Sequence, residues 1–307
     1  MSVGPELEAP RAVAGDEEGF SDAVTVAFGD ERADLYGVAR VGLAGGGASG
    51  LVILFHGGEP VTVRAEGGVA YDEPPSSWDE VSAAGLDTAV VEPLRRWRLQ
   101  FAGDDSSLDL ELEALGAIAE LPADHPAAKA GGMTGYEQAV RVRGAATIGE
   151  QRLDVRGLGQ RGHSWGAPDW DRIGLARSVS CWLGEDLAVS VVAIRPAKGK
   201  AHGDELVAAT LLEAGGNGDD SAGPVARPVE DPRLTTTYDG EGRQRHAGLE
   251  LWVAKDDQLP WHIAGEAICG TSLDLGRLRL DCAFFRWRGR GREGVGRYDV
   301  MRRADGG

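Results

Sequence analysis

The stretch Leu108-Asp109-Leu110-Glu111-Leu112-Glu113 alternates strictly between leucine and an acidic residue. Successive side chains of a β-strand point to opposite faces, so this pattern predicts a strand with one buried face and one wet face. The same period occurs on either side of it. Trp97, Leu99 and Phe101 alternate with polar residues, and Val140 and Val142 alternate with arginines. This part of the chain is therefore predicted to form strands that face a core.

The second half of the chain has the same character. Leu249, Leu251 and Val253 alternate, and the mainly apolar run 187–194 predicts a strand buried on both faces. Only residues 79–84 and 122–130 could hold a helical turn or two. Strands spaced roughly every 8–12 residues, with the turns that 46 glycines allow, are typical of a sandwich or barrel. The predicted fold class is all-β, with two consecutive β-barrel or β-sandwich domains.

The length of 307 residues exceeds one ordinary domain, and the two halves carry similar numbers of predicted strands. Residues 1–15 are rich in Gly, Pro, Ala and acidic residues, which predicts a disordered tail. We expect an N-terminal β-domain over residues 16–152 and a C-terminal β-domain over residues 153–307.

Composition argues against several classes of function. The net charge of −17 would repel nucleic acid, so no nucleic-acid partner is expected. No nucleotide-binding glycine loop follows a predicted strand, and no apolar stretch reaches the ~18 residues of a membrane span. The absence of a signal-peptide pattern predicts a cytoplasmic location. The three cysteines lack metal-ligand spacing, which predicts free thiols and no metal site.

One segment, residues 157–170, gathers a histidine, an acidic residue, two tryptophans, an arginine and a glutamine among four glycines and a proline. Irregular segments of such composition often carry function. The alternative is a structural junction, in which the tryptophans plug a barrel end, His163 bonds the backbone and Arg161 pairs with Asp169. Both interpretations remain open at this point.

The run Gly159-Gln160-Arg161-Gly162-His163-Ser164-Trp165-Gly166, followed by Asp169-Trp170, resembles the central motif of the carotenoid 1,2-hydratase (hydroxyneurosporene synthase) superfamily, most closely its two-domain lipocalin-like relatives. Residues 93–98, 136–138 and 294–298 support the resemblance. It implies two calycin-like domains, with the motif opening the second. It also implies water addition or cyclisation on isoprenoid or polycyclic lipids. Gly162 stands where relatives commonly carry an aspartate, which weakens the hydratase interpretation.

Such chemistry requires a desolvated acid near the reacting carbon and aromatic faces to stabilise a carbocation. His163 and Asp169 are the predicted proton donors in the motif. Glu266 is a third predicted catalytic residue, because it lies among apolar neighbours and an inward carboxyl there could donate a proton; alternation leaves inward and outward equally open. The predicted substrate-binding residues are Trp97, Gln160, Arg161, Trp165 and Trp170, although tryptophans of this kind are more often core than part of a ligand site.

The leading hypothesis is a cofactor-independent hydratase, cyclase or isomerase, that is, a lyase or isomerase acting on an apolar isoprenoid- or polyketide-like molecule by acid–base chemistry in a barrel cavity. The alternative is a non-catalytic carrier of an apolar ligand. An enzyme needs an ionisable group in the cavity, whereas a carrier does not. We expect a cavity of a few hundred Å³ within ~10 Å of Trp165 or Trp170, lined by His163, Asp169 or Glu266. Barrels packed solid would argue against both.

Overall fold

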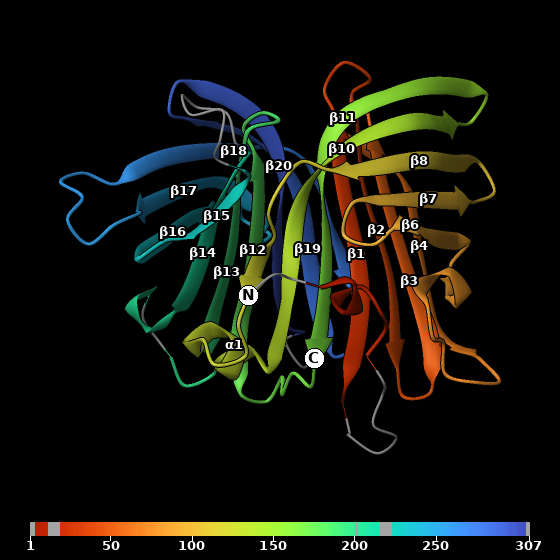
Figure 1. Ribbon diagram of the computed structural model, residues 1–307, viewed down its shortest axis with the longest axis horizontal. Helices are drawn as coiled ribbons and strands as arrows, with labels where there is room; N and C mark the ends of the chain where they lie inside the picture. The colour runs from red at the N-terminus through yellow and green to blue at the C-terminus, as the bar shows by residue number, and fades with distance from the viewer. Residues whose placement is uncertain (1–3, 12–18, 200–201, 215–222, 305–307) are drawn as a thin grey trace. The chain divides into compact units, whose positions relative to one another are not determined.

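The computed structural model describes residues 4–11, 19–199, 202–214 and 223–304, and they form an all-β protein of two barrel-like parts (Figure 1). The predicted fold class is confirmed. Helical segments are short: η1 (Pro5–Leu7), η2 (Trp78–Glu80), α1 (Pro126–Gly131) and η3 (His202–Asp204). Two of them fall close to the positions where the sequence allowed a helical turn.

Within the described residues the first sheet has eleven strands, in the order β4-β3-β2-β1-β11-β10-β8-β7-β6-β5, with β9 paired to β10. Its strands are β1 (Ser21–Asp30), β2 (Leu35–Ala44), β3 (Gly47–His56), β4 (Glu59–Ala70), β5 (Ser82–Ala83), β6 (Leu86–Glu92), β7 (Arg96–Ala102), β8 (Ser106–Ala114), β9 (Ala119–Leu121), β10 (Met133–Ile148) and β11 (Gln151–Gly166). One of the two sheets forms a nearly closed barrel and the other a half-barrel.

The second sheet has nine described strands, in the order β15-β14-β13-β12-β20-β19-β18-β17-β16. They are β12 (Ile173–Trp182), β13 (Leu187–Pro196), β14 (Leu206–Glu213), β15 (Val225–Pro228), β16 (Asp231–Tyr238), β17 (Gln244–Trp252), β18 (Trp261–Asp274), β19 (Leu278–Gly289) and β20 (Arg292–Arg303).

Backbone contacts divide the chain into two units whose segments interleave along the sequence. Unit 1 comprises Met1–Leu115 and Ala139–Ala167, and unit 2 comprises Gly116–Gln138 and Pro168–Gly307. The domain boundary predicted between residues 152 and 153 falls inside β11 and does not coincide with this division. The physical reason is that β11 pairs antiparallel with β1 from Ser21↔Gly166 to Gly29↔Leu158, which ties the whole motif strand to unit 1.

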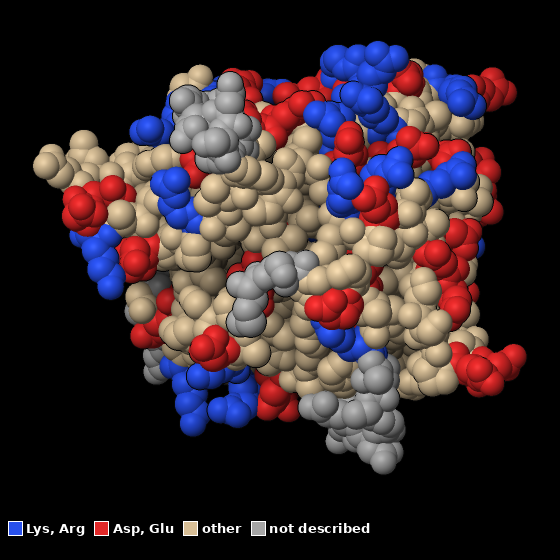
Figure 2. All heavy atoms as spheres, in the orientation of Figure 1, with Lys and Arg blue, Asp and Glu red and all other residues tan. Residues whose placement is uncertain are grey.

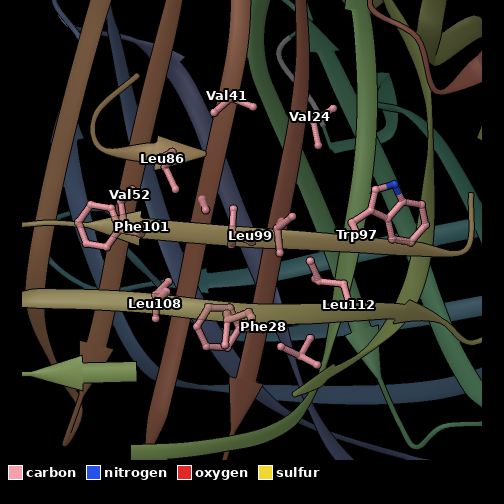
Figure 3. Packing of buried hydrophobic residues seen from close by; sticks show 14 of the residues in the cluster. Val24, Phe28, Val41, Val52, Leu86, Trp97, Leu99, Phe101, Leu108 and Leu112 are labelled. Carbon is pink, nitrogen blue, oxygen red and sulfur yellow. The ribbon is translucent and has the colours of Figure 1, made fainter. Parts of the chain in front are cut away.

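The core of unit 1 lies between strands that cross each other (Figure 3). Trp97, Leu99 and Phe101 of β7, with Leu108 and Leu112 of β8, face the apolar side chains of β1, β2 and β3. The alternation read from the sequence is confirmed, since Leu108, Leu110 and Leu112 are buried while the acidic residues between them are exposed. Burying one face of each strand in this way fixes the register, because a slip of one residue would expose the apolar set.

The core of unit 2 is built in the same way on the inner face of the second sheet. Phe285 stacks on Trp287 with ring centroids 5.4 Å apart, and Tyr298 lies 5.3 Å from the same ring. The predicted buried strand 187–194 is found as β13, which is buried along almost its whole length. Cys181, Cys269 and Cys282 are all buried and free, which confirms the prediction of free thiols.

Candidate active site

The motif strand β11 turns alternate side chains into the interior of unit 1. Arg161 lies opposite Val26 of β1, His163 opposite Val24 and Trp165 opposite Asp22. Val24 and Val26 belong to the apolar core of unit 1, so this face of β11 is the inner one. The strands can approach because Gly159 has no side chain: a Cβ there would lie 2.3 Å from the carbonyl oxygen of Ala27. The glycine therefore serves close packing of the motif strand.

His163 is fully buried and is held at both ring nitrogens. Its Nε2 lies 2.7 Å from Oδ1 of Asp22, which is also fully buried, and its Nδ1 lies 2.9 Å from the carbonyl oxygen of Leu7. A carboxylate and a carbonyl are both acceptors, so a neutral imidazole beside an ionised Asp22 would aim one lone pair at another. Each acceptor is satisfied when the ring nitrogen that faces it carries a hydrogen. The geometry therefore places a histidine–aspartate pair, held at both ring nitrogens, in the interior of unit 1.

Two tryptophan rings lie against the histidine. The Trp78 ring meets His163 edge-on, at 5.4 Å and an interplanar angle of 85°, and the Trp165 ring is tilted at 4.9 Å. The guanidinium of Arg11 also lies over the Trp165 ring, 4.2 Å from the ring centroid. The backbone N–H of Arg11 donates to Oδ2 of Asp22 over 2.6 Å. The His163–Asp22 pair thus lies beside aromatic rings, one of which also carries a cation–π contact.

A second charged pair lies on the same inner face. Arg161 is 1% exposed, its guanidinium lies 4.6 Å from the Trp97 ring centroid, and it donates to the carboxylate of Glu8. The other oxygen of Glu8 accepts the backbone N–H of Leu94 over 2.8 Å. Glu8 belongs to residues 4–11, called here the N-terminal segment. Its placement differs from the disordered tail predicted for residues 1–15, because Glu8 has a buried guanidinium to pair with; residues 1–3 and 12–15 lie outside the described residues.

The structure brings together four of the predicted site residues: Trp97, Arg161, His163 and Trp165. Gln160 is buried on the opposite face of β11 from them. Asp169 is exposed and lies in unit 2, where its carboxylate accepts the backbone N–H of Asp171 over 3.0 Å. That hydrogen bond and two to its carbonyl oxygen shape the turn into β12. Asp169 therefore does not pair with Arg161, as the structural-junction alternative had it.

The two other predicted residues also belong to unit 2. Trp170 packs against Ala127, Ile173 and Ile194, a small apolar cluster beside α1. Glu266 is exposed on β18, with His246 and Arg286 as its cross-strand neighbours. Strand alternation left the direction of the Glu266 side chain open. The structure places it on the solvent side, and not in the desolvated surroundings that a proton donor requires.

The residues that sequence reasoning missed are Asp22, Glu8 and Trp78. Asp22 carried a readable signal, because it continues the apolar face of Val24, Val26 and Phe28 on β1, where an acid is out of pattern. Glu8 and Trp78 carried none, since each precedes a strand and its contact is set by the fold.

A groove of about 660 Å³ lies on the outer side of unit 1. Figure 2 shows acidic and basic side chains interspersed over this face. Charged residues of β7, β8, β10 and β11 line it, among them Arg98, Asp109, Glu111, Arg143 and Arg152. It is not the apolar cavity predicted beside Trp165 or Trp170. The carbonyl oxygen of Leu7 lies against His163, and the carboxylate of Glu8 lies against Arg161. Both residues belong to the predicted tail.

The described residues hold no group of three or more His, Cys, Asp and Glu side chains placed to bind a metal ion. No helix among them is long and apolar enough to cross a bilayer.

Comparison with known families gives one match over almost the whole chain. Residues 4–304 match the model of a domain of unknown function, DUF7064. The chain belongs to the DUF7064 family. No curated protein sequence matches it.

Solved structures resemble the DUF7064 chain in fold. A candidate AttH protein from Nitrosomonas europaea superposes with a TM-score of 0.66 at 12% identity, covering 93% of this chain and 94% of that one. Kievitone hydratase from Nectria haematococca gives 0.65 at 13% identity, covering 98% and 93%. CghA gives 0.64 at 14% identity, covering 94% and 90%. These likenesses extend the two-barrel architecture to proteins of very different sequence.

Proposed function

We propose that unit 1 binds a small molecule with an apolar body and that the His163–Asp22 pair transfers a proton to it, in a hydration, cyclisation or isomerisation. The observation that carries the proposal is the buried pair itself, with a partner at each ring nitrogen and two tryptophan rings against the histidine. A binding barrel without chemistry has no need of a buried acid, and burying one is costly. The fold shared with a protein named kievitone hydratase supports the same direction.

The roles within the pair follow from its geometry. Asp22 holds Nε2–H and so fixes the orientation of the ring, as a carboxylate does for a catalytic histidine. Nδ1–H points away from the sheet strands toward Leu7, and it is the proton that a bound substrate can reach. This chain has Gly162 where relatives commonly carry an aspartate. Here the carboxylate beside the histidine is that of Asp22, on the neighbouring strand β1.

The proton balance closes for each reaction. Nδ1–H protonates an alkene carbon or a carbonyl oxygen, and the positive charge that develops on the substrate lies near the Trp78 and Trp165 rings. In a hydration, water adds to the cation and returns one proton to Nδ1. In an isomerisation or cyclisation, the substrate loses a proton from another carbon to Nδ1. In either case the pair ends with the two protons with which it began.

The test is a search for turnover. The protein is incubated in heavy-oxygen water with kievitone, other prenylated phenols and polyenes, and products are separated by mass spectrometry. We expect a product heavier by one water, or one of unchanged mass and new retention. His163→Gln and Asp22→Asn should each lower the rate at least ~100-fold. His246→Gln, which changes an exposed histidine of unit 2, should leave it unchanged.

Binding without turnover across the panel would assign the protein to the carriers. Turnover that survives both substitutions, in variants that circular dichroism shows to be folded, would move the chemistry to other residues.

A further inference from the structure

The carboxylate of Glu8 is bound as a ligand would be. Glu8 is 4% exposed, and it enters the interior of unit 1 from outside the sheet, directly after η1. Both oxygens are engaged, one by the guanidinium of Arg161 and the other by the N–H of Leu94. A charge-assisted guanidinium contact combined with a backbone donor is a standard way to bind a carboxylate.

The receiving side belongs wholly to the first sheet and its turns. Arg161 and Trp97 stand on β11 and β7, and Leu94 lies in the turn between β6 and β7. Leu94 has a φ of 60°, a left-handed conformation that is uncommon for a residue with a side chain. A strained backbone conformation persists only where the surrounding structure enforces it. Here the strained residue, Leu94, is the one whose N–H donates to the Glu8 carboxylate. We call Arg161, the Trp97 ring and the Leu94 N–H the carboxylate cradle.

The N-terminal segment that supplies Glu8 is attached by few contacts. None of the three residues of η1 is buried, and Glu6 is exposed. The segment also makes two hydrogen bonds, Leu7 O with His163 and the Arg11 N–H with Asp22, and one cation–π contact, the Arg11 guanidinium over Trp165. A segment that buries little apolar surface opens at a low free-energy cost compared with the sheet it covers.

We propose that the carboxylate cradle is the binding site for the carboxylate of an apolar organic acid, and that Glu8 occupies it until such an acid displaces the N-terminal segment. The inference deepens the proposed function and rests on it for the claim that the acid is the substrate. Displacement also removes Leu7 O from Nδ1 of His163, so one event seats the acid and uncovers the proton donor. The aromatic rings beside both groups suit a flat, unsaturated body.

Glu8 competes from within the chain, and a tethered group acts at an effective concentration in the millimolar range. Removing it should therefore strengthen the binding of an external acid. Biphenyl-4-carboxylate and its neutral counterpart biphenyl-4-carboxamide are suitable probes, with affinity measured by calorimetry. Glu8→Ala should bind the carboxylate at least ~10-fold more tightly than the wild type does. It should leave the affinity for the amide unchanged.

The matched control is Glu6→Ala, an exposed glutamate of the same segment, which should behave as the wild type. Arg161→Gln should abolish the preference for carboxylate over amide. A gain that is equal for carboxylate and amide, or that also appears in Glu6→Ala, would overturn the proposal.

Glu8→Ala removes a buried partner of Arg161 and is expected to lower the melting temperature. A second measurement therefore tests whether an added carboxylate restores it. Its melting temperature is compared in sodium acetate and in sodium chloride of the same ionic strength. A ligand that binds the folded state raises the melting temperature. Acetate should raise that of Glu8→Ala above the chloride value and leave the wild type unaffected; equal effects of the two salts would contradict the cradle.

The two proposals fail separately. Carboxylate-selective binding without any turnover would uphold the cradle and refute the acid–base function. Turnover of neutral substrates without carboxylate selectivity would do the reverse.

Discussion

Each unit buries one arginine on the inner face of its sheet and pairs it with a glutamate. Arg161 is 1% exposed and pairs with Glu8, and Arg177 is 3% exposed and pairs with Glu205. In unit 2 the glutamate directly precedes β14. Arg177 also donates to two residues of β16, to Thr236 Oγ1 over 2.9 Å and to the carbonyl oxygen of Leu234 over 3.1 Å. In unit 1 the glutamate comes from outside the sheet.

The two arginines differ in what surrounds them. Around Arg177 the partners besides Glu205 are strand residues, and burial raises the pKa of Tyr298 to about 12, so its hydroxyl stays neutral and bonds Thr236 over 2.5 Å. Among the described buried residues of unit 2 there is no histidine. In unit 1, Arg161 shares its inner face with the buried His163–Asp22 pair. Under the proposed function, the Arg177 pair is a structural network and the Arg161 pair is part of a binding site.

The largest effect is expected from Glu205→Ala. It leaves a charged guanidinium in the core of unit 2 without its carboxylate, which should lower the free energy of unfolding by about 3–5 kcal/mol. Chemical denaturation measures it. The control is the double variant Arg177→Met/Glu205→Leu, which should recover most of the loss because no charge remains buried. A loss below about 1 kcal/mol would show that the Arg177 network is not structural.

Glu8→Ala should cost less than half as much as Glu205→Ala. The N-terminal segment can move aside and admit water to Arg161, so the charge does not stay desolvated. The two variants are compared in the same denaturant titration. Equal losses would break the contrast between the units, because Glu8 would then be as fixed as Glu205.

Thiol labelling can assign each loss to its unit, because all three cysteines lie in unit 2. Burial raises the pKa of Cys181 and of Cys282, so little reactive thiolate exists in the folded protein at neutral pH. Under native conditions labelling should be slow, and in denaturant three thiols should react. Glu205→Ala should accelerate native labelling about 10-fold or more, whereas Glu8→Ala should leave it unchanged. Acceleration by Glu8→Ala would mean that the two units open together.

The smallest effect is expected at a partly exposed pair of unit 2, Asp186 with Arg292, whose atoms approach to 2.5 Å. The hydrogen bond from Arg292 lowers the pKa of Asp186. A lowered folded-state pKa means stability that is present above the ordinary aspartate range and is lost as the pH falls through the folded value. Asp186→Asn should cost less than about 1 kcal/mol at pH 7 and still less in acid. A constant cost across pH would show that charge is not its source.

The sequence predicted what is local. Alternation located the inner faces of β7 and β8, and composition singled out β11 with His163 and Arg161. The sequence could not predict the partners of those two residues, because Asp22 lies 141 residues from His163 and Glu8 lies 153 residues from Arg161. Period and propensity carry no information on such pairings. Asp169 and Trp170 were grouped with the motif because they follow it, but β11 ends at Gly166 and the chain passes there into unit 2.

The pairing of β1 with β11 also sets the order in which this chain can fold as it is made. Ser21 leaves the ribosome 145 residues before its partner Gly166, and the intervening chain includes a segment of unit 2. Contacts so distant in sequence close slowly. Until β11 emerges, one edge of β1 stays unpaired, and unpaired edges invite association with other chains. The strand that carries His163 is therefore also the strand whose arrival covers that edge of β1.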